Sequence, residues 1–166
     1  LGPEMKATGE VLGVGKEFGT ALNKAYAAAG VEINNKEKGI FVTLSDSEKP
    51  NFIKTVNKYL ELGFTLYSTE GTGKFLKTNG IDSVIVGKAD DLGQTSLTII
   101  EDKLVSLVIN TPTYANELSD GWKIRRLSHE TGVAVVSSVR EADAFIEAFL
   151  NQNLVLDDLE VIQDVS

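Results

Sequence analysis

The sequence has 166 residues, of which 42% are hydrophobic, and it carries a formal net charge of −8. This length fits one ordinary domain with appendages, and the hydrophobic fraction is sufficient for a packed core. The acidic balance argues against a nucleic-acid-binding surface, because phosphate backbones are bound by clustered Lys and Arg. The lack of cysteine excludes disulfides and thiol catalysis and fits a cytoplasmic location. The sequence contains no apolar run of membrane-spanning length, so we expect neither a nucleic acid nor a membrane as a partner.

The first 38 residues precede the main pattern of the chain. Residues 1–15 are glycine-rich and lack a helical period, whereas residues 16–29 place apolar side chains at helical spacing and predict an amphipathic helix that Gly30 ends. We assign residues 1–30 to the end of a preceding, larger unit. The polar residues 31–38 are interpreted as a linker.

From Gly39 onward, short apolar runs alternate with amphipathic stretches. Strands are predicted at residues 40–44, 64–67, 81–86, 104–109 and 133–136. Helices are predicted through residues 53–60, 74–79, 94–101, 122–130 and 142–149, with a helical turn at 113–119. Ser47 is expected to cap the first of these helices, and Ser138 with Glu141 predicts a capping box for the last. The alternation predicts an α/β, three-layer, Rossmann-like domain over residues 39–151: a five-stranded parallel sheet with helices on both faces. The acidic tail, residues 152–166, has no predicted structure.

One glycine-rich stretch, residues 67–73 with the sequence YSTEGTG, follows the second predicted strand and opens a helix. The first N–H groups of a helix have no partner within it and carry the positive end of its dipole. The hydroxyls of Thr69 and Thr72 add donors, and Gly71 and Gly73 allow a ligand to approach the backbone closely. The stretch therefore predicts a cradle for a phosphate or a carboxylate. An ordinary helix cap is the alternative interpretation.

Polar residues also follow the other predicted strands. Thr43 ends the first strand and is followed by Lys49, Lys88 follows the third strand, and Asn110 and Thr111 follow the fourth. Ligands of open parallel sheets bind beyond the carboxyl ends of the strands. We therefore expect these residues to meet the YSTEGTG turn at one edge and to grip a small anion.

Candidates for catalysis are few. The single histidine, His129, lies on a predicted helix and is expected at the surface. Asp90 and Asp91 have the chemistry of general bases or metal ligands, but adjacent acids in a loop usually face water. No metal-ligand spacing is found. Arg125 and Arg126 suit either an anion or surface ion pairs, and the sequence does not decide between them.

The opening residues, 3–13 with the sequence PEMKATGEVLG, resemble the segment that closes the second ATP-grasp unit of the carbamoyl phosphate synthetase large subunit. The residues that follow, to about residue 150, resemble the C-terminal regulatory domain of that subunit, a methylglyoxal-synthase-like domain. This resemblance implies an allosteric domain without catalytic residues or a cofactor of its own. The parent enzyme would be an ATP-dependent ligase, using Mg or Mn, for glutamine-dependent carbamoyl phosphate synthesis in the pyrimidine and arginine pathways. The implied partners are the rest of the large subunit and the glutaminase small subunit.

The resemblance also implies the ligand and its site. The effector would be UMP, IMP or phosphoribosyl pyrophosphate, or N-acetylglutamate in urea-cycle members. The phosphate-binding positions of the family fall on Thr43, Lys49, Thr69, Gly71, Thr72, Lys88, Asn110 and Thr111. The family's Asn-Thr-Thr is replaced by Asn110-Thr111-Pro112, which removes one hydroxyl.

Methylglyoxal synthase, a lyase that acts on dihydroxyacetone phosphate, is the enzymatic alternative. Its catalytic aspartate lies in a Gly-Gly-Asp-Gln segment, whereas this chain has Asp91-Leu92-Gly93-Gln94, without an acid directly before the glutamine. We therefore expect Asp91 to lie out of reach of a ligand and the chain to bind without turnover. A scaffold between domains that binds no small molecule is a third possibility.

Overall fold

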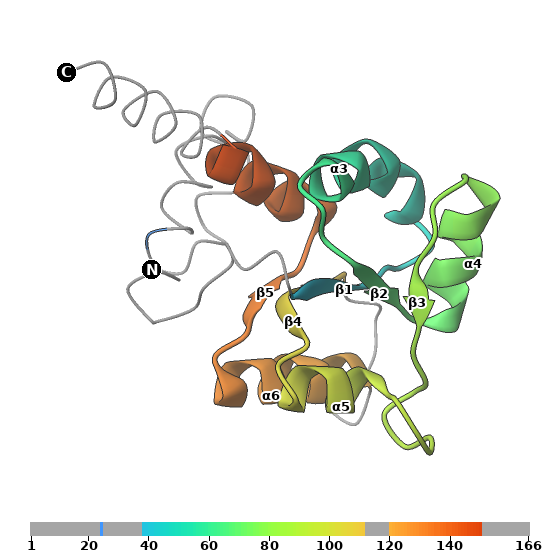
Figure 1. The fold of residues 1–166 in the computed structure, drawn as a ribbon, viewed down its shortest axis with the longest axis vertical. Helices are drawn as coiled ribbons and strands as arrows, with labels where there is room; N and C mark the ends of the chain where they lie inside the picture. Colours follow the sequence, from blue (N-terminus) through green and yellow to red (C-terminus); the bar gives the residue numbers. More distant parts are fainter. Residues whose placement is uncertain (1–23, 25–37, 112–119, 151–166) are drawn as a thin grey trace.

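The computed structural model describes Lys24 and residues 38–111 and 120–150 (Figure 1). Several predictions therefore lie outside the described residues. These are the helix at 16–29 apart from Lys24, the linker at 31–38 apart from Lys38, the turn at 113–119 and the tail at 152–166.

The described residues form one parallel sheet of five strands. In chain order these are β1 (Gly39–Thr43), β2 (Leu66–Ser68), β3 (Val84–Ile85), β4 (Val105–Asn110) and β5 (Ala134–Val136). Their order across the sheet is β3-β2-β1-β4-β5, and every neighbouring pair is parallel. The predicted five-stranded parallel sheet is confirmed.

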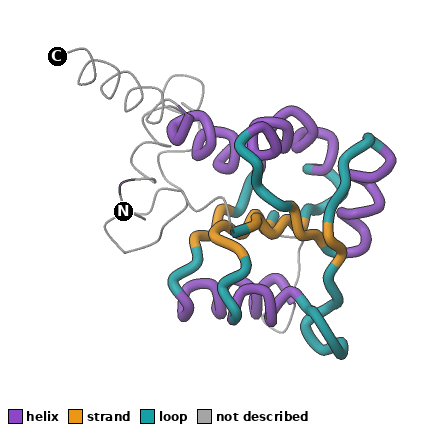
Figure 2. Tube along the Cα trace, in the orientation of Figure 1, coloured by secondary structure: helices purple, strands orange, loops and turns teal. Residues whose placement is uncertain are grey.

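Helices cover both faces of the sheet, as the sequence predicts. The helices α3 (Lys49–Glu61) and α4 (Glu70–Thr78) pack on one face together with residues 139–150, which are also helical. The helices α5 (Ser96–Glu101) and α6 (Asp120–Thr131) lie on the opposite face (Figures 1 and 2). No helix within the described ranges combines the length and the apolar character needed to cross a bilayer.

The core consists of two clusters separated by the sheet. Ile40 and Val42 of β1 belong to the cluster under α3, α4 and residues 139–150, where Phe52, Tyr59 and Phe145 are fully buried. The neighbouring Phe41 belongs to the other cluster, with side chains of α5 and α6. Alternate residues of a strand point to opposite faces, and a strand buried on both faces is therefore apolar throughout.

Three local predictions were wrong at the residue level. Helix α4 begins at Glu70, not at Lys74, so that most of the YSTEGTG stretch forms its first turn. Glu48 occupies the N-cap of α3 without a side-chain cap, whereas the Ser47 hydroxyl lies 3.3 Å from that of Ser45. Ser138 accepts from the Glu141 N–H, but the Glu141 carboxylate accepts from the N–H of Ser137, so that only half of the capping box forms.

Candidate functional site

A cavity of about 650 Å³ lies at the carboxyl ends of the strands. The chain runs outward from β1 to β3 and then returns to place β4 on the other side of β1. The connections after β1 and β4 therefore leave in opposite directions, and a crevice opens where they separate. Thr43 and Asn110, the last residues of these two strands, are paired in the sheet and both line this cavity.

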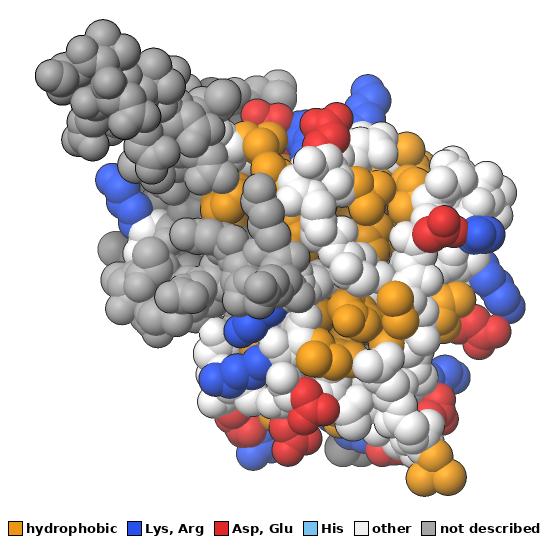
Figure 3. All heavy atoms as spheres, in the orientation of Figure 1, with side chains coloured by type: hydrophobic (Ala, Val, Ile, Leu, Met, Phe, Trp, Pro, Cys, Tyr) orange, Lys and Arg blue, Asp and Glu red, His pale blue; other side chains and the backbone are white. Residues whose placement is uncertain are grey.

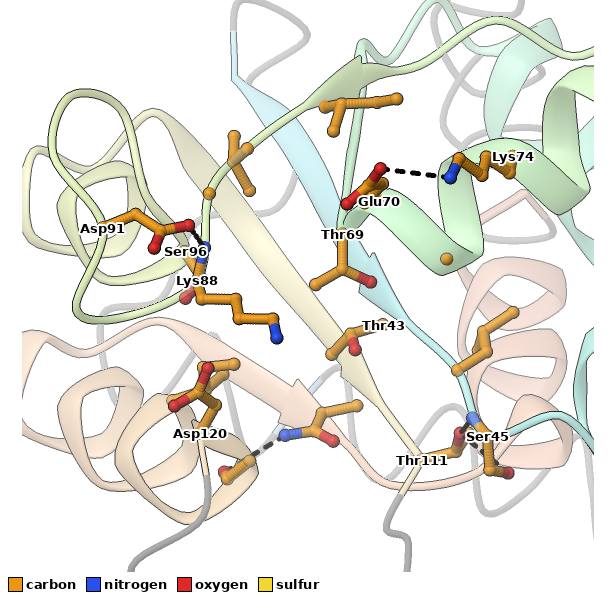
Figure 4. Close-up of a pocket in the computed structure, with 18 of the residues that line it drawn as sticks. Thr43, Ser45, Thr69, Glu70, Lys74, Lys88, Asp91, Ser96, Thr111 and Asp120 are labelled. Carbon is orange, nitrogen blue, oxygen red and sulfur yellow. Dashed lines mark hydrogen bonds and ion pairs between the residues drawn. The ribbon is translucent and has the colours of Figure 1, made fainter.

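The structure brings together most of the predicted site residues. Six of the eight line the cavity: Thr43, Thr69, Gly71, Lys88, Asn110 and Thr111. Lys49 and Thr72 are not among the lining residues. Figure 4 shows that the labelled residues come from the end of β1 and the segment after it, α4 and its N-cap, the loop after β3, the start of α5, the segment after β4 and the start of α6.

The first turn of α4 supplies backbone donors. Its N-cap residue, Thr69, has an extended backbone and makes no side-chain cap, and the helical hydrogen bonds begin with Gly73 N–H donating to the Thr69 carbonyl at 2.7 Å. The preceding N–H groups of Glu70, Gly71 and Thr72 have no acceptor within the described residues. Such groups attract an anion through hydrogen bonding and through the helix dipole.

Hydrogen bonds of Thr72 and the close approach of Gly73 to β2 hold this turn in place. The buried Thr72 hydroxyl accepts a hydrogen bond from the Leu44 N–H at 3.1 Å, which joins α4 to the end of β1, and a second from the Thr69 hydroxyl at 3.3 Å. Gly73 lies so close to β2 that an added Cβ would stand 2.7 Å from the Ser68 Oγ. The Thr72 side chain thus orients the turn, a role that its sequence position did not indicate.

Lys88 is directed into the cavity by a tight turn. Its N–H donates to Asp91 Oδ2 at 2.8 Å, and the Asp91 N–H donates to the Lys88 carbonyl at 3.0 Å. Figure 4 shows the Lys88 side chain extending into the cavity toward Thr43. Within the described part of the chain, its ammonium has no ion-pair partner. A cation left unpaired in a cavity is available to an anionic ligand.

The opposite wall of the cavity comes from the first turn of α6. The buried Asn110 amide donates to the Gly121 carbonyl at 3.1 Å, and the Thr111 hydroxyl accepts from the Ser45 N–H at 2.6 Å. Asp120, Gly121 and Ile124 line this wall, and the sequence analysis did not select them. The available signal was their position at the start of the helix that follows β4.

The two arginines of α6 have different environments. Arg125 lines the cavity, where an added Cβ at Gly121 would lie 3.5 Å from its guanidinium. Arg126 forms an ion pair with Glu130 at 3.1 Å and stacks 5.2 Å from the Trp122 ring centre. Of the two roles that the sequence left open, the structure shows a surface ion pair for Arg126 and places Arg125 at the cavity. His129 is exposed, as predicted.

Acidic side chains also border the cavity, and here one expectation was wrong. Asp91 lines the cavity although the sequence analysis placed it out of reach of a ligand, because the turn that directs Lys88 inward brings Asp91 with it. Asp120 lines the cavity as well and accepts from the Ala89 N–H at 3.4 Å. Glu70 pairs with Lys74 at 3.1 Å. Among the residues described, no group of three or more acids or histidines could hold a metal ion.

Comparisons with known proteins agree with this architecture. The family model described as "MGS-like domain" matches residues 51–137. The chain is 39% identical over 152 residues, 91% of its length, to the carbamoyl phosphate synthase large chain of Lachnoclostridium phytofermentans. It is 40% identical over 149 residues, 89% of its length, to the C-terminal section of that large chain in Aquifex aeolicus. In an alignment of 168 positions that covers 99% of the chain, it is 37% identical to the large chain of Kocuria rhizophila.

These relatives are much longer than the chain, which spans 14%, 27% and 15% of their respective lengths. The family model nevertheless covers more than half of the chain, including α3 from residue 51 onward, the first turn of α4, Lys88 and Asn110. The resemblance inferred from the sequence is confirmed, and the chain belongs to the family of MGS-like domains.

Proposed function

We propose that the chain is the allosteric effector-binding domain of a carbamoyl phosphate synthase large subunit and that its cavity binds a phosphorylated effector such as UMP, IMP or phosphoribosyl pyrophosphate. One observation carries this proposal. In the part of the chain that the structure describes, N–H groups without an acceptor in the first turn of α4 and a Lys88 ammonium without an ion-pair partner adjoin the same cavity.

The chemistry of the cavity suits a phosphoryl group. A phosphate monoester carries nearly two negative charges and three strong acceptor oxygens. The α4 amides and Lys88 would hold these oxygens, and the hydroxyls of Thr43 and Thr69 would add donors. Arg125 and Asn110 lie on the opposite wall and would contact the rest of the effector. The cavity volume, about 650 Å³, is within the usual range of sites for small molecules.

Regulation would follow from coupling to the remainder of the enzyme. The proposed partners are the rest of the large subunit, which uses ATP with Mg or Mn, and the glutaminase small subunit, all in the cytoplasm. An effector alters a remote active site only if it favours one arrangement of the whole enzyme, and such couplings are typically about 1–3 kcal/mol. The domain itself would bind its effector without transforming it.

Isothermal titration calorimetry of the 166-residue chain with UMP, IMP and phosphoribosyl pyrophosphate tests the proposal. We expect one-site binding of at least one of these ligands, weakened at high salt because charge contributes to it. The absence of a binding isotherm for all three would overturn the proposal and favour a scaffold between domains.

The lyase alternative requires its own assay, because Asp91 and Asp120 border the cavity. Incubation of the chain with dihydroxyacetone phosphate, followed by detection of methylglyoxal, should show no turnover above the uncatalysed rate. Formation of methylglyoxal at an enzymatic rate that disappears in Asp91→Asn would replace effector binding with catalysis as the function of this cavity.

A further inference from the structure

Lys49 and Asp46 form an ion pair at the margin of the cavity. The Lys49 Nζ lies 2.6 Å from Asp46 Oδ1, and hydrogen bonding and charge from Lys49 lower the pKa of that carboxyl. The two partners differ in exposure, because the Lys49 side chain is 17% exposed and the Asp46 side chain is 96% exposed. The lysine is therefore held against the protein, whereas the carboxylate reaches it from solvent.

The Lys49 ammonium is also close to the first turn of α4. An added Cβ at Gly71 would lie 3.8 Å from the Lys49 Nζ, and Gly71 is one of the residues that line the cavity. Lys49 nevertheless is not a lining residue in this structure, in which Asp46 holds its ammonium. The cation is thus within a short side-chain movement of an anion bound at the α4 amides.

The backbone around this pair is anchored. The N–H groups of Glu48 and Lys49 both donate to the Ser45 carbonyl, at 3.0 and 3.2 Å. The Ser45 N–H in turn donates to the Thr111 hydroxyl at 2.6 Å. Lys49 therefore starts α3 from a fixed position, and its side chain rather than its backbone decides which anion it contacts.

We propose that Asp46 competes with the phosphoryl group of the effector for the Lys49 ammonium and thereby limits the affinity of the cavity for phosphorylated ligands. This inference rests on the proposed function. Loss of the ion pair between Asp46 and Lys49 should lower the stability of the protein only slightly. The Asp46 side chain is already exposed to water, and such an ion pair contributes only weakly to stability. A phosphate gains a second cation beside Lys88, and charge-assisted hydrogen bonds to phosphate are strong. Asp46 additionally repels the phosphate as a like charge.

The test is calorimetry with UMP, IMP and phosphoribosyl pyrophosphate on the 166-residue chain and three variants of this pair: Asp46→Asn, Lys49→Met and the double variant. We expect Asp46→Asn to bind about three- to tenfold more tightly than the parent chain, as expected for removal of one exposed competing charge. Lys49→Met should bind more weakly. In the Lys49→Met background, Asp46→Asn should restore only the small part of the affinity that like-charge repulsion removes.

The chain provides a matched control in Asp82. Asp82 pairs with Lys77 at the same distance, 2.6 Å, is similarly exposed, and is not among the residues that line the cavity. Asp82→Asn changes the net charge by the same amount, so it measures the effect of overall charge on phosphate binding. We expect it to leave the dissociation constants within experimental error.

The outcomes separate the two proposals. Suppose that the parent chain binds a ligand and that Asp46→Asn does not increase the affinity, or increases it no more than Asp82→Asn does. The proposed competition by Asp46 is then wrong, and the proposal of effector binding stands. If Asp46→Asn increases the ligand affinity equally in the parent chain and in Lys49→Met, competition for the Lys49 ammonium is likewise refuted. If neither the parent chain nor Asp46→Asn binds any of the three ligands, both proposals fail. Binding detected only in Asp46→Asn would support both.

Discussion

Two lysines of the domain, Lys58 and Lys88, have opposite environments. The Lys58 ammonium, on α3, lies 2.7 Å from Asp143 and 2.7 Å from Glu147, and Asp143 also accepts from the Thr55 hydroxyl at 2.9 Å. The Lys88 ammonium extends into the cavity and has no ion-pair partner within the described ranges.

The difference indicates what each charge does. Lys58 joins α3 to the helical residues 139–150, and its charge is neutralised within the protein. Lys88 is fixed through its backbone, so its charge contributes little to folding and is available to a ligand. The ion pairs of Lys58 therefore hold two helices together, whereas the Lys88 charge, which has no ion-pair partner among the described residues, is the one we expect a ligand to use. Substitution of each lysine should separate these effects.

The largest expected effect is the loss of ligand binding in Lys88→Met. Hydrogen bonds to charged groups contribute about 1.5–3 kcal/mol, so the dissociation constant of the ligand found by calorimetry should rise about ten- to a hundredfold. The midpoint of urea unfolding should stay unchanged, because the Lys88 ammonium has no ion pair to lose within the described residues.

Lys54→Met is the matched control for Lys88→Met. Lys54 is exposed on α3 and does not line the cavity, and its replacement changes the net charge equally. The dissociation constant of the ligand from Lys54→Met should match that from the parent chain. Equal weakening in both variants would mean that overall charge, rather than the unpaired lysine in the cavity, governs binding.

A second prediction concerns Tyr59, which lies at the contact between α3 and residues 139–150 that Lys58 also joins. This fully buried tyrosine donates its hydroxyl hydrogen to the Ala142 carbonyl at 2.7 Å, so it joins the same two helices as Lys58 does. Tyr59→Phe leaves a buried carbonyl without this donor and should lower the free energy of unfolding by about 1–2 kcal/mol in urea titrations. Ligand binding should be unaffected.

The burial of Tyr59 also predicts that the free energy of unfolding depends on pH in the alkaline range. Burial, and to a smaller extent the charge of Asp143, raises the pKa of Tyr59 well above 10.0. Above pH 10 the unfolded chain releases this proton and the folded protein keeps it, so stability is lost as pH rises. Urea titrations at pH 9 and pH 11 should show a smaller loss in Tyr59→Phe than in the parent chain. An equal loss in both would contradict burial of a neutral tyrosine.

The sequence was informative about the fold because the signals for each strand and helix are local. The apolar run in β1 and the helical spacing in residues 142–149 predict burial on their own, and both are buried. The site was only partly predictable, because its details depend on side-chain partners. Asp46 and Asp91 lie only three residues from Lys49 and Lys88, but this spacing did not indicate that Lys49 would be left out of the cavity lining or that Asp91 would turn inward with Lys88.

The third prediction concerns Lys58, whose substitution should change the free energy of unfolding less than that of Tyr59. Partial burial lowers the pKa of Lys58, but the hydrogen bonds and charges of Asp143 and Glu147 outweigh it and raise the value overall. Because these side chains are partly exposed, Lys58→Met should lower the free energy of unfolding by only about 0.5–1 kcal/mol. Unchanged calorimetric affinity is the second expected result. A loss of binding without a loss of stability would reverse the distinction between Lys58 and Lys88.

The smallest effect belongs to Lys77 and Asp82, an exposed pair of which neither member lines the cavity. The hydrogen bond and the charge of Lys77 lower the pKa of Asp82 below 3.8. A folded-state pKa below the unfolded value favours the folded state above about pH 3.8 and this contribution is lost as pH falls through the folded-state pKa, but for a fully exposed pair we expect it to be too small to detect in unfolding. In Lys77→Met, a carbon-13 titration of the Asp82 carboxyl should show its pKa returning toward 3.8, while that of Asp46 stays low. Because solvent screens the pair, the urea midpoint at neutral pH should not change. A shifted midpoint would mean that exposed pairs stabilise this domain as well, and pairing alone would no longer distinguish the lysines that hold the fold from those that do not.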